Sequence, residues 1–308
     1  MTRLGHRDPV PDHLRGAIVA LGNFDGFHLG HQRVVSEAVT WARGEGRPAI
    51  VATFDPHPVR HFAPHVPPFR LTTLDQREAL FAAAGADAML VFEFDDALAA
   101  TPAEAFVSEL LAGHLGVAGV VTGEDCTFGK GRAGNVGVLA EVGARHGIAA
   151  RPLGPVTEGG LPVSSSRIRD ALKAGDCETA TRLMTRPFAI RGTVQHGDKR
   201  GRTIGYPTAN IDMGPYLRPR YGIYAVTGLL LDSGETLKGA ANLGIRPQFE
   251  PAQELLEPHF FDFSGDLYGR EIEVALHHFL RPEAKFESVE ALTAQMAEDC
   301  ARARELLG

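Results

Sequence analysis

The chain has 308 residues, of which 44% are hydrophobic and 22% charged, and its formal net charge is −7. This composition is typical of a globular protein of about two domains. The acidic balance and the lack of a long basic run argue against general nucleic-acid binding. No apolar run approaches the roughly 18 residues that cross a bilayer, which argues against a membrane protein.

The N-terminal residues and the cysteines indicate in which cellular compartment the protein works. The first 16 residues contain no apolar core, so we expect no signal peptide. Cys126, Cys177 and Cys300 lie far apart and indicate neither a disulfide framework nor a zinc cluster. We therefore expect a cytoplasmic protein that acts on small molecules, as a monomer or weak homo-oligomer, without nucleic-acid or membrane partners.

Apolar strands alternate with helical segments from about residue 17 to residue 155. The expected strands span 17–22, 49–54, 88–94, 119–123 and 148–153, and the expected helices span 31–44, 74–84, 102–115 and 133–146. This alternation predicts a parallel sheet with helices on both faces. Ligands bind such sheets at the carboxyl ends of the strands. The segments GNFDGFHLGH (22–31) and FDPHP (54–58) each follow a strand, so we expect them to line one cleft.

The pattern changes near Arg186–Pro187. Two short helices are expected before that point, at 164–175 and 177–184. From 188 to about 282, short β-like runs are separated by Gly, Pro and Asp turns, which predicts a compact barrel or sandwich. An amphipathic helix at 287–306 closes the chain. The predicted domains are 1–186 and 187–308.

GNFDGFHLGH spans the end of a strand and the start of a helix, where unpaired N–H groups favour phosphate. Gly26 and Gly30 allow close approach of a ligand, and His28 and His31 are donors for charge that develops on a phosphate. Adenylyl transfer requires positioning and charge stabilisation rather than a serine or cysteine nucleophile. The alternatives are a metal site and two exposed surface histidines. The segment SSSRIR, at 164–169, favours the phosphate site because it adds hydroxyls and two arginines.

GDKRGRTIGYPTANI, at 197–211, indicates a second phosphate site. Its glycines and basic side chains indicate either a loop that covers phosphates or a solvated charged loop. Thr208 and Asn210 lie two residues apart, so on an extended strand they face the same way and offer oxygen ligands for Mg²⁺. Phosphoryl transfer to an alcohol also benefits from a carboxylate near the attacking hydroxyl. The spacing does not choose among the candidates Glu250, Glu254, Glu257, Asp262 and Asp266.

These motifs resemble a known family. GNFDGFHLGH is similar to the HxGH signature of nucleotidylyltransferases. TFDPHP, LTTLDQRE, TGEDCTFGKGRAGN and SSSRIR follow in the order seen in the adenylyltransferase module of bacterial bifunctional riboflavin kinase/FMN adenylyltransferases. GRTIGYPTANI, ANLGIRPQF, EPHFFDFSGDLYG and KFESVEALTAQMAED resemble the riboflavin kinase module of the same family. The resemblance extends from about residue 16 to residue 305. It implies an α/β, Rossmann-like nucleotidylyltransferase domain, then a small antiparallel Greek-key β-barrel with a C-terminal helix.

The resemblance also implies two activities and their residues. One module phosphorylates riboflavin to FMN, the other joins FMN and ATP to give FAD and pyrophosphate, and both use Mg²⁺. On this analogy His28 and His31 contact the ATP phosphates and Glu257 is the catalytic base of the kinase. The other ATP-binding residues of the adenylyltransferase would be Gly22, Asn23, Phe24, Asp25, Gly30, Ser165, Ser166 and Arg169, and its flavin-binding residues Asp55, His57, Asp125 and Phe128. In the kinase, Thr208 and Asn210 would hold the metal, and Gly201, Arg202, Gly205, Pro207 and Arg246 would bind ATP or flavin.

Four positions depart from the family pattern. Cys126 replaces a Phe on the flavin side, Ser166 replaces a Thr but keeps the hydroxyl, and Gln248 replaces a Thr. Pro258 follows the proposed base, and because a strand proline favours an edge or a bulge, we expect it to re-aim Glu257. Cys126, Gln248 and Pro258 keep open the alternative that one module is inactive. Two further alternatives are a non-catalytic flavin-binding protein and a metal-binding regulator that uses His28, His31 and His57.

Overall fold

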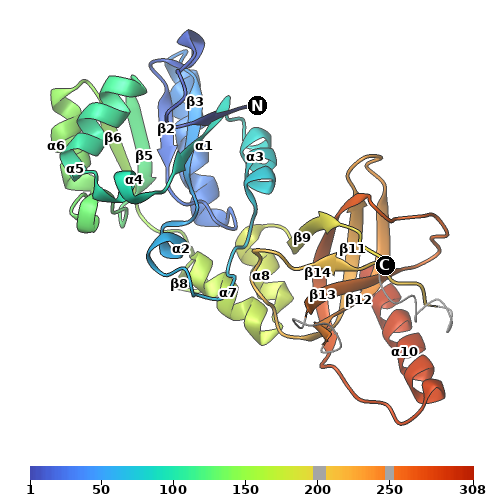
Figure 1. The fold of residues 1–308 in the computed structure, drawn as a ribbon. Coiled ribbons are helices and arrows are strands. Elements are labelled where there is room, and N and C mark those ends of the chain that lie inside the picture. The colour runs from blue at the N-terminus through green and yellow to red at the C-terminus, as the bar shows by residue number, and fades with distance from the viewer. Residues whose placement is uncertain (197–205, 247–252) are drawn as a thin grey trace. The chain divides into compact units, whose positions relative to one another are not determined.

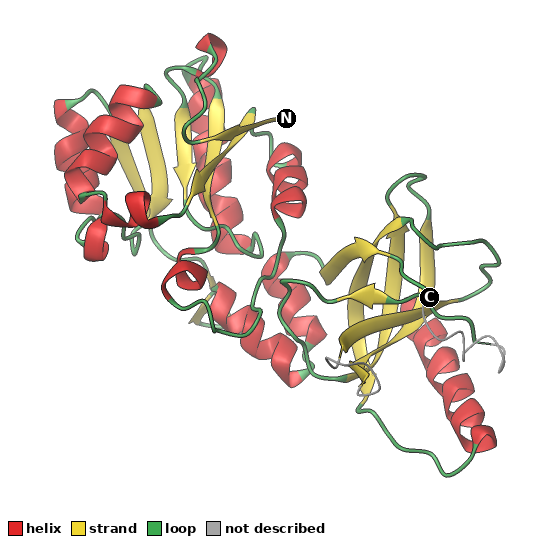
Figure 2. Cartoon of the chain, in the orientation of Figure 1, coloured by secondary structure: helices red, strands yellow, loops and turns green. Residues whose placement is uncertain are grey.

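The computed structural model describes residues 1–196, 206–246 and 253–308, and they form two compact units (Figures 1 and 2). The first comprises Met1–Pro67 and Thr72–Ser164, and the second Pro68–Leu71 and Ser165–Gly308. The helices expected at 164–184 are therefore grouped with the second unit. The boundary between catalytic modules near residue 186 stays a prediction.

The first unit is built on a six-stranded parallel sheet with the order β1-β4-β3-β2-β5-β6. The strands are β1 (Thr2–Gly5), β2 (Ile18–Leu21), β3 (Ala49–Asp55), β4 (Ala88–Glu93), β5 (Gly119–Gly123) and β6 (Ala149–Leu153). Counted from β2, the last five strands have the order 3-2-1-4-5 of a Rossmann sheet. The expected parallel sheet is confirmed, and the strand order reverses between β2 and β5.

Helices cover both faces of this sheet, as predicted. They are α1 (Leu29–Gly44), α2 (Pro58–Phe62), α3 (Leu74–Ala83), α4 (Asp96–Ala100), α5 (Ala103–Ala105) and α6 (Val136–Arg145). Val19 and Leu21 of β2 pack into a core with residues of α6, whereas Ile18 and Ala20 pack with α1 and α3. This alternation follows from the two-residue period of a strand. The single helix expected at 102–115 is instead α5 followed by a π helix, Phe106–His114, which buries Phe106 and Leu111 in the first core.

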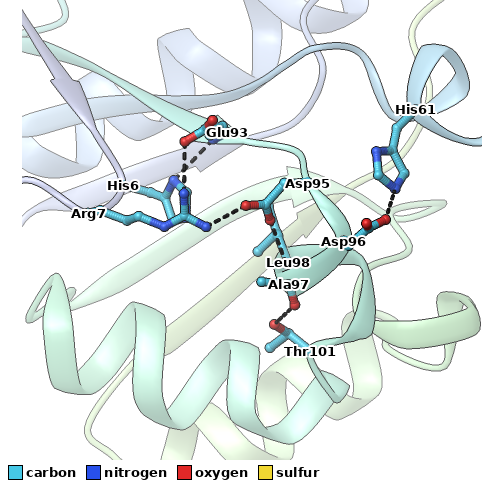
Figure 3. Close-up of polar contacts among 9 residues, drawn as sticks. All are labelled: His6, Arg7, His61, Glu93, Asp95, Asp96, Ala97, Leu98 and Thr101. Carbon is cyan, nitrogen blue, oxygen red and sulfur yellow. Dashed lines mark hydrogen bonds and ion pairs between the residues drawn. The ribbon is translucent and has the colours of Figure 1, made fainter.

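The N-terminal strand β1 was not predicted, and it pairs with β4 at the edge of the sheet. The residues that follow it anchor the connection (Figure 3). The buried His6 ring accepts a hydrogen bond from the Glu93 N–H through Nδ1, at 3.0 Å, and lies 5.5 Å from the Phe92 ring. Arg7 pairs with Glu93 and Asp95, and its guanidinium lowers the pKa of Asp95 to about 2.

We expect this unit to lose stability as the pH falls below about 6.5, the ordinary pKa of histidine. Burial, followed by the nearby Arg7 charge, lowers the pKa of folded His6. The unfolded chain therefore binds this proton at a higher pH than the folded chain does, and acid favours unfolding. Urea titrations from pH 7.5 to pH 5, followed by the fluorescence of Trp41, the chain's one tryptophan, would measure this loss.

His6→Asn, which does not titrate, should weaken the dependence on pH, while His13→Asn at an exposed position should leave it intact. An equally steep dependence in His6→Asn would contradict the prediction.

The barrel of the second unit is a six-stranded antiparallel sheet with the order β10-β13-β12-β11-β14-β9. Its strands are β9 (Phe188–Thr193), β10 (Ile211–Asp212), β11 (Gly222–Leu230), β12 (Thr236–Arg246), β13 (Gln253–Phe260) and β14 (Glu271–Arg281). The meander β11-β12-β13 is followed by β14, which returns beside β11, and this is a Greek key. The Gln195 N–H donates to the Asn210 carbonyl at 2.8 Å and nearly closes the barrel. The predicted Greek-key barrel is confirmed.

Two short strands and two helices follow the parallel sheet in the sequence, and a long helix follows the barrel. The two-residue strands β7 (Thr157–Glu158) and β8 (Leu161–Pro162) precede α7 (Ser165–Ala174) and α8 (Cys177–Met184). The last helix, α10 (Val289–Leu307), packs Ala303 against Ala225 and Ala240 on the outer face of the barrel. Arg281 of β14 holds the same helix through the buried Asp299, at 2.7 Å. Among the described residues, no helix combines the length and apolar character needed to span a membrane.

Pro258 introduces no bulge into its strand, and whether it re-aims Glu257 stays a prediction. β13 pairs with β12 without a register shift from Gln253 to Phe260. The N–H and C=O groups of one residue point to the same side of an antiparallel strand. The Pro258 carbonyl accepts from the Ala209 N–H, so the missing donor also faces residues 206–209, which form no strand. The ladder with β12 is therefore intact on both sides of Glu257.

Candidate active sites

The two histidines of GNFDGFHLGH lie together where β2 ends and α1 begins, next to the point at which the strand order reverses. His28 is the N-cap of α1, is 5% exposed, and accepts from the His31 N–H through Nδ1 at 3.4 Å. The two rings are stacked, with their centroids 3.6 Å apart. A Cβ at position 30 would lie 3.2 Å from the His28 ring, so Gly30 leaves room for it. His28 is therefore not an exposed surface histidine.

Buried side chains hold the backbone of this turn in shape. Phe24 and Phe27 have φ angles of 50° and 41°, and both rings pack edge-on against Phe81 of α3. Phe24 is 1% exposed, so its contribution to a ligand site would come from its backbone. Such left-handed conformations persist only where the surroundings enforce them.

Polar groups from two other segments also brace the turn. Asp25, 4% exposed, accepts from the N–H and hydroxyl of Thr72, and the Gly26 N–H donates to the same hydroxyl. Arg77, 3% exposed, donates to the Asn23 carbonyl at 3.1 Å and to the Thr53 hydroxyl at 2.6 Å. These contacts link the turn to β3 and α3. Thr72 and Arg77 were missed as site residues, although both belong to the motif LTTLDQRE.

The residues proposed for the flavin side lie at the carboxyl ends of two strands of the first unit, β3 and β5. Asp55 ends β3, and His57 caps α2 by accepting from the Val59 N–H at 3.2 Å. Asp125 is exposed, whereas Phe128 is buried and packs on Phe106. Cys126 is partly buried against the same core, and burial raises the pKa of its thiol. The residue therefore keeps an apolar contact despite its small size.

From Ser165 onward, the SSSRIR residues lie at the start of α7, in the second compact unit. Ser165 is half-buried, and Ser166 is exposed. Arg169 donates from Nε to the Phe69 carbonyl at 2.9 Å, and its guanidinium lies 5.2 Å from the Phe69 ring. A part in adenylyl transfer for these three residues stays a prediction.

The barrel brings Glu257 and Asn210 together. Ile211 pairs with Leu256, and the Ala209 N–H donates to the Pro258 carbonyl at 2.9 Å. Asn210 lies between these two contacts and so faces Glu257 across the strand pair. Residues opposite each other in a sheet project from the same face. A proposed metal ligand and the proposed base therefore share one face of the barrel.

A pocket is lined by Ala209 and Pro258, the chain neighbours of Asn210 and Glu257, but not by those two residues themselves. Its lining includes Pro207, Thr208, Phe263, Asp266 and Tyr268. The His196 ring packs against Tyr268, with centroids 3.9 Å apart. Thr208 thus borders a cavity with aromatic and polar walls. Because residues 206–209 form no strand, the expectation that Thr208 and Asn210 face the same way stays a prediction.

The structure distinguishes among the candidate carboxylates. Glu254 is held by Arg218 at 2.7 Å and by the Tyr221 hydroxyl, and Asp262 is paired with Arg304 at 2.7 Å. Asp266 caps a turn by accepting from the Tyr268 N–H. Glu257 instead lies across from Asn210, and the amide of Asn242 donates to it at 3.4 Å. Of the described candidates, Glu257 is the one that lies opposite Asn210, and its role as the base stays a prediction. Glu250, Gly201, Arg202, Gly205 and Gln248 lie outside the described residues, as does the side chain of Arg246.

Two family models match the chain. The model for FAD synthetase matches residues 10–167, and the model for riboflavin kinase matches residues 184–307. Curated relatives cover nearly the whole length. The bifunctional riboflavin kinase/FMN adenylyltransferase of Escherichia coli (strain K12) is 39% identical over 95% of this chain and 93% of its own. That of Bacillus subtilis (strain 168) is 36% identical over 92% of this chain and 90% of its own.

A solved structure shares the fold over both domains. It is a crystal structure described as a macrolide-efflux protein from Streptococcus pneumoniae, which is 28% identical to this chain. The match has a TM-score of 0.88 and covers 99% of each chain.

Proposed function

The chain belongs to the family of bifunctional riboflavin kinase/FMN adenylyltransferases, and on that premise we propose how its residues divide the two reactions. The enzyme phosphorylates riboflavin to FMN and then transfers an adenylyl group from ATP to FMN, giving FAD and pyrophosphate. The proximity of Glu257 to Asn210 in the barrel is the observation that carries the residue assignment for the kinase.

In adenylyl transfer, a phosphate oxygen of FMN attacks the α-phosphorus of ATP and pyrophosphate leaves. His28 and His31 donate to the phosphate oxygens on which charge develops, and the positive end of the α1 helix dipole lies beside them. Their stacked rings and the braced turn fix these donors before ATP arrives. Ser165, Ser166 and Arg169 hold the triphosphate, while Asp55, His57, Asp125 and Phe128 form the flavin side.

In riboflavin phosphorylation, the ribityl 5′-hydroxyl attacks the γ-phosphorus of ATP, the bond to ADP breaks, and Glu257 takes the hydroxyl proton. A carboxylate in this position supplies general base catalysis. The pocket beside Thr208 and Pro207 accommodates part of a substrate. Gly201, Arg202, Gly205 and Arg246 are proposed to bind ATP or flavin on sequence grounds alone.

The proposed Mg²⁺ fits the groups present in the barrel. The Thr208 hydroxyl and the Asn210 amide oxygen are hard ligands, and Mg²⁺ in phosphoryl-transfer sites takes few protein ligands besides water and phosphates. When bound with ATP, the ion neutralises phosphate charge. Among the described residues there is no group of three His, Cys, Asp or Glu side chains that could hold a metal ion.

The remaining expectations concern compartment and assembly. Both reactions consume ATP, so we place the enzyme in the cytoplasm, where ATP is supplied. It works on small molecules as a monomer or weak homo-oligomer, which sedimentation velocity would test.

Conversion of riboflavin in the presence of ATP and Mg²⁺, followed by chromatography of the flavins, tests the bifunctional assignment. We expect wild type to form FMN and then FAD. Asn210→Ala should lose at least about tenfold in FMN formation, because a metal ligand is missing, and should still convert added FMN to FAD. Omission of Mg²⁺ should stop both steps. An Asn210→Ala enzyme that makes FMN at the wild-type rate would reject the metal assignment. A wild type that stops at FMN would instead indicate one inactive module.

A further inference from the structure

The side chain of Asn242 is in an unusual position on the barrel. It lies on β12 directly opposite Glu257 of β13, and its Nδ2 donates to Glu257 Oε2 at 3.4 Å. Asn210 faces Glu257 from the other side. Three polar side chains, Asn210, Glu257 and Asn242, thus form a row across three adjacent segments of one sheet face.

The two ends of the Asn242 amide have different surroundings. An ionised carboxylate only accepts hydrogen bonds, so the NH₂ group must face Glu257 and the carbonyl oxygen must point elsewhere. That oxygen, Oδ1, is buried, and it has no hydrogen-bond partner among the described residues. A buried acceptor without a donor is unfavourable, and native proteins hold few of them.

The neighbours of Asn242 on β12 show how this part of the face is covered. Ala240, two residues away, packs against Phe261 and α10. At Gly244, two residues the other way, a Cβ would meet the carboxylate of Glu283. Asn242 therefore lies between an apolar contact with α10 and a position closed by an acidic side chain. Among the described residues, neither neighbour donates to Oδ1.

We propose that Asn242 Oδ1 accepts a hydrogen bond from the ribityl 4′-hydroxyl of riboflavin, and so makes the kinase specific for a polyol acceptor. The inference rests on the proposed role of Glu257 as the base for the 5′-hydroxyl. Because the Asn242 amide contacts Glu257, the hydroxyl next to the reacting one is the donor closest to Oδ1. The Asn242 side chain thereby orients Glu257 through Nδ2 and binds the 4′-hydroxyl through Oδ1.

The test compares riboflavin with 4′-deoxyriboflavin as kinase substrates, in wild type and in Asn242→Leu. Wild type should lose about tenfold in kcat/KM when the hydroxyl is absent, the effect of one hydrogen bond. Asn242→Leu should phosphorylate both compounds with similar kcat/KM, because the partner of the hydroxyl is gone. A purely structural role of Asn242 would lower both rates and leave the ratio between the two substrates unchanged.

A second variant keeps the inference testable if Asn242→Leu does not fold. Asn242→Asp keeps an acceptor oxygen, so it should keep the preference for riboflavin even though its charge, next to Glu257, lowers the rate. Equal use of the two substrates by wild type would overturn the inference alone, as would an unchanged preference in Asn242→Leu. A wild type without kinase activity, or a fully active Glu257→Gln, would overturn the proposed function and this inference with it.

Discussion

His28→Ala should lose at least about a hundredfold in the conversion of FMN to FAD, the typical effect of removing a donor to developing charge. Riboflavin phosphorylation should stay at the wild-type rate, because Glu257 and Asn210 belong to the other compact unit. The same chromatographic assay, started from FMN or from riboflavin, separates the two reactions. His28 is suited to this role because it is buried at the first turn of α1 and stacked on His31.

The side chain of His28 also caps α1, so the alanine variant alone confuses helix stability with chemistry. His28→Asn resolves this, since asparagine is a good N-cap and restores the capping bond without the imidazole. We expect His28→Asn to remain as inactive as His28→Ala in FAD formation while unfolding like wild type. His146→Ala, at an exposed position in the same unit, is the matched control. FAD formation near the wild-type rate in His28→Asn would show that the histidine acts only as a cap.

Glu257→Gln should slow riboflavin phosphorylation by about 10² to 10⁴, the range expected for loss of a general base. Glutamine keeps the shape of the side chain and can still accept from Asn242, so the barrel should remain intact. Steady-state kinetics with riboflavin, and a separate assay of FMN adenylylation that should not change, would measure this result.

Two other carboxylates provide the comparison for Glu257→Gln. Glu235→Gln at an exposed turn should leave both activities unchanged. Glu254→Gln removes the charge that pairs with Arg218 and one of the two oxygens that accept from Arg218 and Tyr221, so it should reduce stability rather than the chemical rate. Kinase activity close to wild type in Glu257→Gln would transfer the role of base to another group, with Asp266 of the pocket as the first candidate.

Local sequence patterns determined most of the fold. The alternation of apolar strands and helices in the first half predicted five strands within one or two residues, because buried strands and amphipathic helices have distinct periods. Strand β1 was missed, since its residues are exposed or half-buried and carry no apolar run. The bounds of β13 were likewise not predicted, and Glu257 lies inside this strand.

The candidate sites were predicted where a motif is contiguous. His28 and His31 are both in one segment, so a helix start was sufficient to bring their rings together. The choice of Glu257 among five carboxylates, in contrast, depends on resemblance. The pairing of β13 with β10 and β12 adds only that Glu257 lies opposite Asn210 and Asn242, and no sequence period encodes that pairing.

The sequence by itself therefore determined the two fold classes, their order and the two motif-bearing segments, because all of these depend on local periodicity and on residues adjacent in the chain. Only the tertiary structure decided that Thr72 and Arg77 brace the histidine turn, that Pro258 leaves its strand undisturbed, and that Asn242 contacts Glu257. Each of these depends on which backbone or side chain lies opposite, and that is set by strand register and packing between segments distant in the chain.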